Sequence, residues 1–286
     1  MNFINPKTDF AFKKIFGSDQ SKPILKSFLN ALLYDEQPII EDLEILNPYL
    51  VPKIEGMKDT YVDVRAVLKG GRRVIIEMQV LNVEGFEKRI LYNAAKSYSD
   101  QLDQGEDYPS LSPVVALTIT DFVMFPEHKE VKSVYLLKEK ERLTDYREGD
   151  IELVFVELPK FTKTLDELKG VMEKWLYFLR KAPSLELAPG SMTAVPEIDR
   201  AFDIANRANL SREEKEIQDS KLTFLRDQRG AINLAGKKGN EEGRAEGEHL
   251  KALAIARRML TAMSDQAIAE FTELPLATIA ELRAKS

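Results

Sequence analysis

The sequence lacks cysteine altogether and has only two histidines among its 286 residues. The absence of cysteine excludes disulfide bonds, thiolate zinc sites and cysteine nucleophiles, and it suits a reducing cytoplasm. His128 and His249 lie far apart in polar surroundings. This spacing excludes a histidine-rich metal cluster, and a Ser-His-Asp triad would have to depend on one of the two. Carboxylates therefore remain as the expected source of chemistry.

Long hydrophobic runs are missing as well. No stretch of about 18 consecutive apolar residues occurs, so the sequence predicts no membrane-spanning helix. Residues 1–14 contain neither an apolar segment nor a small-residue cleavage site, and therefore do not resemble a secretory signal. We expect a soluble protein that acts in the cytoplasm and has no membrane partner.

The charge balance is acidic, with a formal net charge of -6. An acidic chain is not typical of a general nucleic-acid binder, although a local basic patch is compatible with it. Residues 1–34 form such a patch, since they hold five lysines against two aspartates. This patch is either a nucleic-acid contact or an ordinary solvated helix face.

The pattern of apolar residues predicts an α/β domain. Helical spacing over residues 9–33, interrupted at Gly17 and Pro23, predicts two short helices. Strand-type runs follow at residues 43–46, 61–68 and 72–81, and then a helical stretch at 87–102. The continuous apolar run at 114–119 predicts a buried central strand, and the runs at 133–137 and 151–156 complete a mixed sheet.

The second half of the chain is expected to be helical. Three prolines and a glycine within residues 182–196 predict a linker between a domain at 1–181 and a helical region at 197–286. Glycines at 236, 239, 243 and 247 indicate either a helix face that a partner helix approaches or a flexible linker. Ser264 is a good N-cap, and two short helices should follow it. Because their only basic residues are Arg283 and Lys285, they indicate a dimerisation module rather than a DNA reader.

Two neighbouring strands each present a carboxylate on their less apolar side. Alternation places Val74, Ile76 and Met78 on one face and Glu77 on the other, and it places Asp63 opposite the face of Val62 and Val64. A two-residue turn at Gly70 and Gly71 would set Asp63 across from Met78. A three-residue loop at 69–71, typically a type I turn followed by Gly71 in the left-handed conformation, would instead set Asp63 across from Glu77.

In the three-residue register the two carboxylates would lie about 4.5–5.5 Å apart at Cβ, where like charges repel unless a cation lies between them. Mg²⁺ prefers carboxylate oxygens and retains water molecules, so it suits this pair. Bound there, it would neutralise a scissile phosphate and activate a water molecule. Gln79 would point into the same site. The same pattern is also compatible with an ordinary solvated strand face.

Several motifs follow one another along the chain: DFAFKKIFG at 9–17, YVDVRA at 61–66, IEMQ at 76–79, then Arg89, Tyr98, Gln101, Leu102 and Gly105. As an ordered set they resemble the bacterial Rpn family of recombination-promoting nucleases, also called putative transposases, within the PD-(D/E)XK nuclease superfamily. The close resemblance covers roughly the first 180 residues. The EGRAEG stretch at 242–247 and the helices after it resemble the tail of the family.

The resemblance implies a restriction-endonuclease-like core of α-β-β-β-α-β order and a divalent-metal-dependent DNA endonuclease. Asp63 and Glu77 match the two metal-binding acids, and Gln79 occupies the position of the superfamily lysine. Glutamine is usual in this family, but a neutral amide supplies no positive charge to the transition state. Asp9 matches an early acid of the family, with a helix N-cap as its alternative role. Lys13 follows one turn later and is within reach of a phosphate.

Arg65 and Arg89 are weaker candidates for DNA contacts, because pairing with a carboxylate explains each more simply. The leading hypothesis is a DNA endonuclease of little sequence specificity that uses Mg²⁺, or another divalent metal such as Mn²⁺ or Ca²⁺. The resemblance links it to recombination or phage defence, and its C-terminal helices are expected to form a homodimer. The alternatives are a weakly active DNA-binding recombination accessory protein and a self-assembling regulatory protein.

Overall fold

The structure is a computed structural model that describes residues 2–50, 60–103, 105–146 and 149–285. It divides into two compact units, Met1–Leu225 and Arg226–Ser286. The division falls within helix α7 (Arg212–Met259). Each unit has a hydrophobic core of its own.

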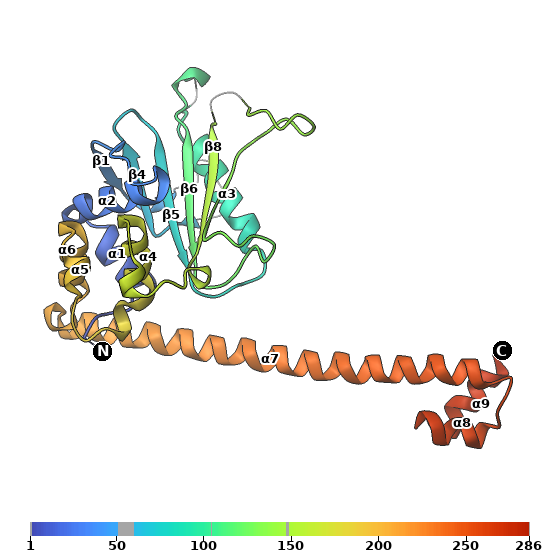
Figure 1. Ribbon diagram of the computed structural model, residues 1–286. Helices are drawn as coiled ribbons and strands as arrows, with labels where there is room; N and C mark the ends of the chain where they lie inside the picture. The colour runs from blue at the N-terminus through green and yellow to red at the C-terminus, as the bar shows by residue number, and fades with distance from the viewer. Residues whose placement is uncertain (1, 51–59, 104, 147–148, 286) are drawn as a thin grey trace. The chain divides into compact units, whose positions relative to one another are not determined.

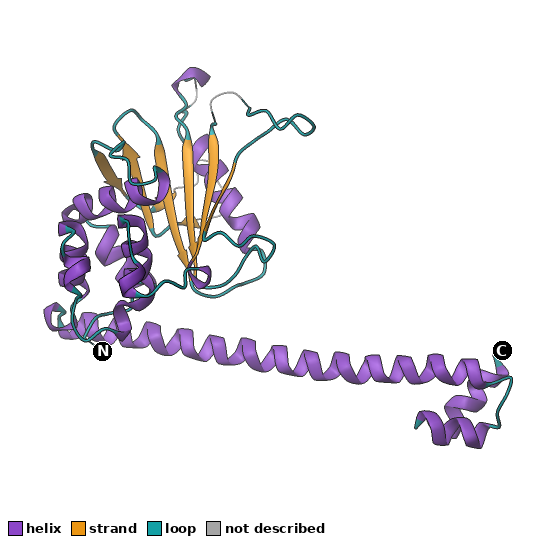
Figure 2. Ribbon diagram, in the orientation of Figure 1, coloured by secondary structure: helices purple, strands orange, loops and turns teal. Residues whose placement is uncertain are grey.

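A six-stranded mixed sheet with strand order β1-β4-β5-β6-β8-β7 forms the centre of the first unit (Figure 2). Strands β5, β6 and β8 are parallel to one another, and the outer pairs are antiparallel. The strands are β1 (Leu43–Leu46), β4 (Val64–Leu68), β5 (Arg73–Gln79), β6 (Val114–Thr120), β7 (Lys132–Tyr135) and β8 (Ile151–Glu157). Strands β2 (Tyr49–Leu50) and β3 (Thr60–Tyr61) form a separate two-stranded sheet. Every residue of β6 is buried, which confirms the predicted central strand.

Helices cover both faces of the sheet (Figure 1). Helix α3 (Phe86–Ser99) lies on one face. The other face is covered by α1 (Asp9–Phe16), α2 (Lys22–Leu33), α4 (Val171–Lys181), α5 (Gly190–Thr193) and α6 (Pro196–Ala205). Short 3₁₀ turns join them at Asp19–Ser21, Tyr108–Ser110, Leu158–Lys160, Leu165–Glu167, Ala182–Ser184 and Arg207–Asn209. The α-β-β-β-α-β order implied by the resemblance is confirmed in α2, β1, β4, β5, α3 and β6.

The main core lies between the sheet and the α1 side. Phe16, Phe28 and Trp175 pack with ring centroids 4.6–5.7 Å apart, which joins α1, α2 and α4. The predicted apolar faces of β4 and β5 contribute to this core through Val64, Ala66, Leu68, Val74, Ile76 and Met78. Val62, expected on the same face, packs instead in the smaller cluster with Ile75 and Ala94 of the α3 side. The reason is a break in the strand at Val62 and Asp63, because β3 ends at Tyr61 and β4 begins at Val64.

The loop between β4 and β5 has the predicted three-residue length. The N–H of Leu68 donates to the Arg72 carbonyl at 2.9 Å, and Val64 pairs with Ile76. Gly71 has φ 90°, as predicted, but Gly70 also has a positive φ, of 101°. Gly70 is the third residue of the turn formed by residues 68–71, and a positive φ at that position is typical of a type II turn. The loop therefore differs from the expected type I turn. The glycines set the predicted register of β4 and β5, but β4 does not extend to Asp63, and the Asp63 side chain contacts α1 whereas that of Glu77 contacts α3.

Residues 182–196 do not form the expected linker. They carry a 3₁₀ turn and α5, and they place Met192 in the core of the first unit. Pro183 and Pro196 lie in the first turns of helical segments, where the missing proline N–H costs no hydrogen bond. The first unit thus extends to Leu225, which differs from the expected boundaries at 181 and 197.

The second unit is helical, as predicted. The side chain of Ser264 accepts from the N–H of Ala267 and caps α8 (Asp265–Thr272), which α9 (Leu276–Ala284) follows. Its core consists of Ala256, Leu260, Ile268, Leu274 and Ile279. The glycines at 236–247 lie within the continuous helix α7 rather than in a flexible linker. Among the residues that the structure describes, no helix is long and apolar enough to cross a membrane.

Candidate active site

Asp63 lies where β4 separates from β5. Its N–H donates to the carbonyl of Ile76 at 3.0 Å. In a continuous ladder Asp63 would lie opposite Glu77, so the regular pairing of the two strands is lost at this residue. Its carboxylate in turn accepts the N–H of Met78 at 2.7 Å through Oδ2. The side chain is 13% exposed. The strand break therefore holds a nearly buried carboxylate in a fixed position at the end of the strand.

Helix α1 brings Asp9 and Lys13 to this carboxylate. Lys13 Nζ lies 2.7 Å from Asp9 Oδ1 and 3.7 Å from Asp63 Oδ1. Thr8 is the N-cap of α1, since its side chain accepts from the N–H of Ala11. The alternative N-cap role of Asp9 is therefore wrong, and Asp9 occupies the first helical position.

Burial and the nearby Asp9 carboxylate raise the pKa of Asp63 to about 8. Partial burial acts to raise the pKa of Asp9, but hydrogen bonding with Asp63 and Lys13 outweighs it and lowers the value. Burial likewise opposes the charge of Lys13, yet the two carboxylates keep its pKa above the ordinary value. Each of the two carboxylates thus affects the pKa of the other, and a proton or a cation between Asp9 and Asp63 would stabilise the pair.

Glu77 lies on β5 and is held from α3. Arg89 Nη2 lies 2.5 Å from Glu77 Oε1 and 2.9 Å from Gln79 Oε1. The amide nitrogen of Gln79 donates to the carbonyl of Leu81 at 2.7 Å. Burial raises the pKa of Glu77 despite the opposing charge of Arg89. The structure thus brings Glu77, Gln79 and Arg89 together, and the expected pairing of Arg89 with a carboxylate is confirmed.

The two carboxylates expected to bind a metal are therefore held by different helices, Asp63 by α1 and Glu77 by α3. Within the described part of the chain, no group of three or more His, Cys, Asp and Glu side chains is arranged to hold a metal ion. The donor chemistry nevertheless fits a hard divalent cation. A buried carboxylate with a raised pKa lies beside a second carboxylate, and carboxylate oxygens are the usual ligands of Mg²⁺.

Arg65 lies apart from these groups. On β4 it pairs with Ile75, its side chain lies near Arg73 and Asp100, and burial together with Arg73 lowers its pKa. Asp100 partly offsets this effect. The guanidinium Nε of Arg65 is buried without a hydrogen-bond partner. The structure therefore does not bring Arg65 to Asp63 or Glu77.

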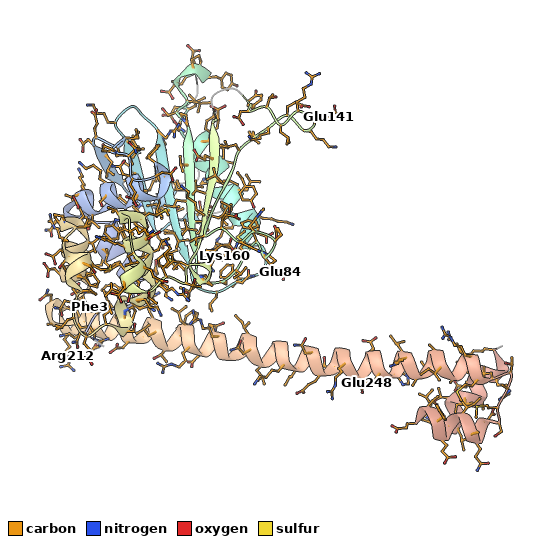
Figure 3. The ribbon with its side chains drawn as sticks, in the orientation of Figure 1. Phe3, Glu84, Glu141, Lys160, Arg212 and Glu248 are labelled. Atoms are coloured by element: carbon orange, nitrogen blue, oxygen red, sulfur yellow. The ribbon has the colours of Figure 1, made fainter. Side chains whose placement is uncertain are left out.

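A cavity of about 750 Å³ lies beside Arg89, between β3 and the first half of α3. It is lined among others by Tyr61, Glu84, Tyr92 and Asn93, and Figure 3 labels Glu84 on the loop before α3. Sequence reasoning missed Asn93 and Tyr92. Asn93 follows Arg89 by four residues, so helical spacing alone would have placed it on the same face.

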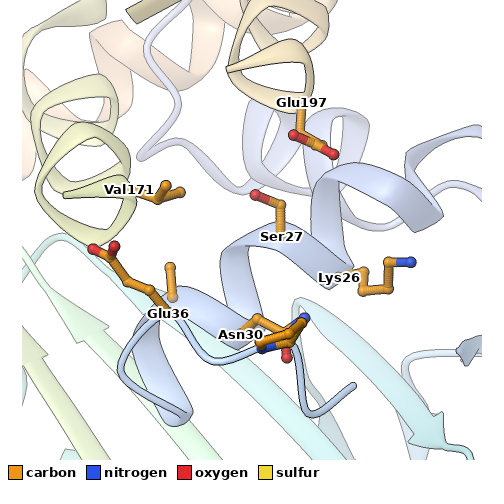
Figure 4. Close-up of a pocket in the computed structure, with 8 residues that line it drawn as sticks. Lys26, Ser27, Asn30, Glu36, Val171 and Glu197 are labelled. Carbon is orange, nitrogen blue, oxygen red and sulfur yellow. The ribbon is translucent and has the colours of Figure 1, made fainter. Parts of the chain in front are cut away.

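A second cavity, of about 200 Å³, lies among α2, α4 and α6 on the opposite face (Figure 4). Two of its polar side chains are already used within the fold. Asn30 bonds the backbone of Ile40, and Glu36 accepts the N–H of Met172. None of the predicted site residues lines this cavity.

Comparison with known proteins identifies a family. The family model described as PD-(D/E)XK nuclease family transposase matches residues 6–235, which include α1, the whole sheet and the candidate site. No curated protein and no solved structure matches the chain.

Proposed function

Because the chain belongs to the PD-(D/E)XK nuclease family transposases, we propose that it is a divalent-metal-dependent DNA endonuclease. The observation that carries this proposal is the buried Asp63 beside Asp9, with a pKa raised to about 8. A carboxylate at such a position is stabilised when a cation replaces its proton. Asp63 and Glu77 are the proposed ligands of Mg²⁺, and Mn²⁺ or Ca²⁺ share the same ligand chemistry.

A bound divalent ion would neutralise charge on the scissile phosphate and lower the pKa of a water molecule. The residues of the chain position that chemistry. The N–H of Met78 fixes Asp63, and Lys13 partly offsets the negative charge of the two neighbouring carboxylates, Asp9 and Asp63. Lys13 is 38% exposed and is the proposed contact to a neighbouring phosphate.

Arg89 supplies the positive charge that Gln79 lacks. It contacts both Glu77 and Gln79 and is 40% exposed, so it is able to turn from Glu77 to a phosphate oxygen. A guanidinium suits this exchange because it binds phosphate in the same bidentate way as carboxylate. Gln79 then orients Arg89 through its amide oxygen.

We propose DNA of any sequence as the substrate, since contacts to phosphates carry no sequence information. The cellular setting is recombination or phage defence in the cytoplasm, which the motif resemblance and the cysteine-free composition favour. Arg65 is retained as a weaker phosphate contact at a distance from the site.

Incubation of supercoiled plasmid with purified protein tests this function. The wild type should nick plasmid in Mg²⁺ and not in EDTA, and Asp63→Ala should lose the activity. The matched control is Glu41→Ala, which removes a carboxylate from an exposed ion pair with Lys69. Nicking by Asp63→Ala at the wild-type rate, or nicking that persists in EDTA, would contradict the proposal.

A weakly active DNA-binding accessory protein is the second candidate. The pairing of Glu77 with Arg89 and the neutral Gln79 favour it, since both weaken the catalytic centre. Plasmid binding without nicking in any of the three metals would select this function.

We further propose that the second unit mediates homodimer formation. Its described residues include exposed apolar side chains at Ile232, Leu234, Leu250, Phe271 and Leu276. Such side chains are typical of surfaces that bind another chain. If the nuclease proves inactive while the dimer forms, a self-assembling regulatory protein replaces the endonuclease as the function.

A further inference from the structure

The cavity beside Arg89 contains buried polar atoms without hydrogen-bond partners. Asn93 is 1% exposed, and although its amide nitrogen favours the charged form of Glu77, its amide oxygen has no partner. The hydroxyl of Thr60 and the Nε of Arg89 are also buried and unpaired. Buried polar groups are nearly always hydrogen-bonded in folded proteins. Several unpaired polar atoms around one cavity therefore indicate that the cavity binds a ligand.

The same cavity has aromatic walls. Tyr61 is 64% exposed, and its ring stacks on that of Tyr49 with centroids 4.6 Å apart and an interplanar angle of 22°. Tyr92 lines the cavity from α3 and is 37% exposed. Exposed aromatic rings of this kind provide flat surfaces on which a planar ligand stacks.

Cationic groups complete the site. Lys88 and Arg89 line the cavity, and Arg89 also contacts Glu77. Asn93 lies beside Glu77 as well, since it favours the charged form of that carboxylate. The cavity is therefore continuous with the candidate active site through both Arg89 and Asn93.

We propose that this cavity binds one unpaired nucleobase of a DNA strand. Tyr61 and Tyr92 together provide the stacking surface for the base, and the unpaired amide oxygen of Asn93 accepts a hydrogen bond from the edge of the base. Lys88 and Arg89 bind the flanking phosphates. The choice of DNA as ligand rests on the proposed function. The cavity thus directs the enzyme toward single-stranded or unpaired DNA.

Fluorescence anisotropy in EDTA tests the proposal, because no cleavage occurs there. The probes are a labelled hexadeoxynucleotide and the same backbone made entirely of abasic residues, which carries the same phosphate charge. We expect the hexanucleotide to bind the full-length protein about tenfold more tightly, from stacking alone. Tyr61→Ala and Tyr92→Ala should each remove most of this difference and leave binding of the abasic strand unchanged.

Asn93→Ala tests the edge contact. It should reduce the difference in affinity among the hexamers of deoxyadenylate, deoxycytidylate and thymidylate, and circular dichroism checks that the variant folds. Asn93→Ser retains one hydrogen-bonding group and should give an intermediate result. Tyr108→Ala is the matched control, because Tyr108 is 80% exposed and does not line the cavity.

Equal affinity for the hexanucleotide and the abasic strand would overturn the proposal, as would tyrosine variants that bind like the control. Competition by a free deoxynucleoside monophosphate at the concentration of the hexamer would also overturn it, by identifying a free nucleotide as the ligand. If base-dependent binding is present but plasmid is not nicked, the nucleobase site stands and the endonuclease fails. If plasmid is nicked but binding does not depend on the bases, the endonuclease stands and the nucleobase site fails.

Discussion

At the residue scale, the sequence predicted the β4–β5 register and the pairing of Arg89 with a carboxylate, but not the break in the strand before Val64. Strand alternation and the two glycines placed Asp63 across from Glu77, and the structure confirms the register through Val64 and Ile76. The break at Val62 was not predictable from a period-2 pattern, because it depends on the separate β2–β3 pair. As a result, the sequence predicted two acids that face each other across the hairpin, whereas Asp63 contacts Lys13 of α1 and Glu77 contacts Arg89 of α3.

The raised pKa of Asp63 has a direct effect on stability. Because the folded state retains a proton that the unfolded state releases above its ordinary pKa of 3.8, the metal-free protein should lose stability as pH rises from about 4 to about 8. The slope is at most about 1.4 kcal/mol per pH unit for one proton. Asp63→Asn should flatten this part of the profile in urea titrations with EDTA. An unchanged slope in the variant would show that Asp63 does not retain the proton.

Substitution of Arg89 by lysine should impair catalysis more than folding. Arg89→Lys keeps the charge but cannot contact Glu77 and Gln79 as the guanidinium does. We expect nicking to slow by about 100-fold, the usual loss for one transition-state donor. Arg212→Lys is the matched control, because the Arg212 side chain is 94% exposed in its ion pair with Glu216. Equal rates for both variants would remove Arg89 from the mechanism.

At the element scale, the order of helices and strands followed from apolar periodicity. The central strand β6 was the clearest prediction, because a continuous apolar run of that length has no exposed face. Prolines were misleading between 182 and 196, since Pro183 and Pro196 begin helical turns there rather than separate domains. Composition alone does not distinguish these two roles of proline.

The glycine loop between β4 and β5 should be sensitive to added side chains. Gly70→Ala forces an alanine to a φ of 101°, which should lower the free energy of unfolding by about 1–2 kcal/mol. Gly71→Ala should cost more, because its Cβ would also lie 2.7 Å from Ser112 Oγ. Urea denaturation measures both effects, and Ser112→Ala should recover only the additional loss at Gly71. If the two glycine variants are equally stable, the contact with Ser112 carries no cost.

At the scale of the whole molecule, the first compact unit ends at Leu225, and we expect this unit to fold by itself. The first part of α7 belongs to this unit, because Gln218 accepts from the Thr8 hydroxyl and Lys14 pairs with Glu214. The net charge of -6 is compatible with the proposed DNA binding, since Lys13 lies beside Asp63 while Lys88 and Arg89 line the cavity beside Glu77.

Truncation after Leu225 should leave a folded monomer, whereas the full chain should sediment as a dimer. Circular dichroism and analytical ultracentrifugation measure the two properties. Phe271→Ser tests the contribution of one exposed apolar side chain, 75% exposed on α8. A monomeric full chain at high concentration would exclude the dimer, and an unfolded truncated chain would exclude the independent unit.

The central claim is that Asp63 and Glu77 together bind one divalent ion. Electron paramagnetic resonance of Mn²⁺, titrated at pH 8.5 into wild type, Asp63→Ala and Glu77→Ala, tests it most directly. We expect one site in the wild type that either substitution weakens at least tenfold. Unchanged Mn²⁺ binding in Glu77→Ala would contradict the claim, because it would leave Glu77 as the partner of Arg89 and assign the ion to Asp63 and Asp9.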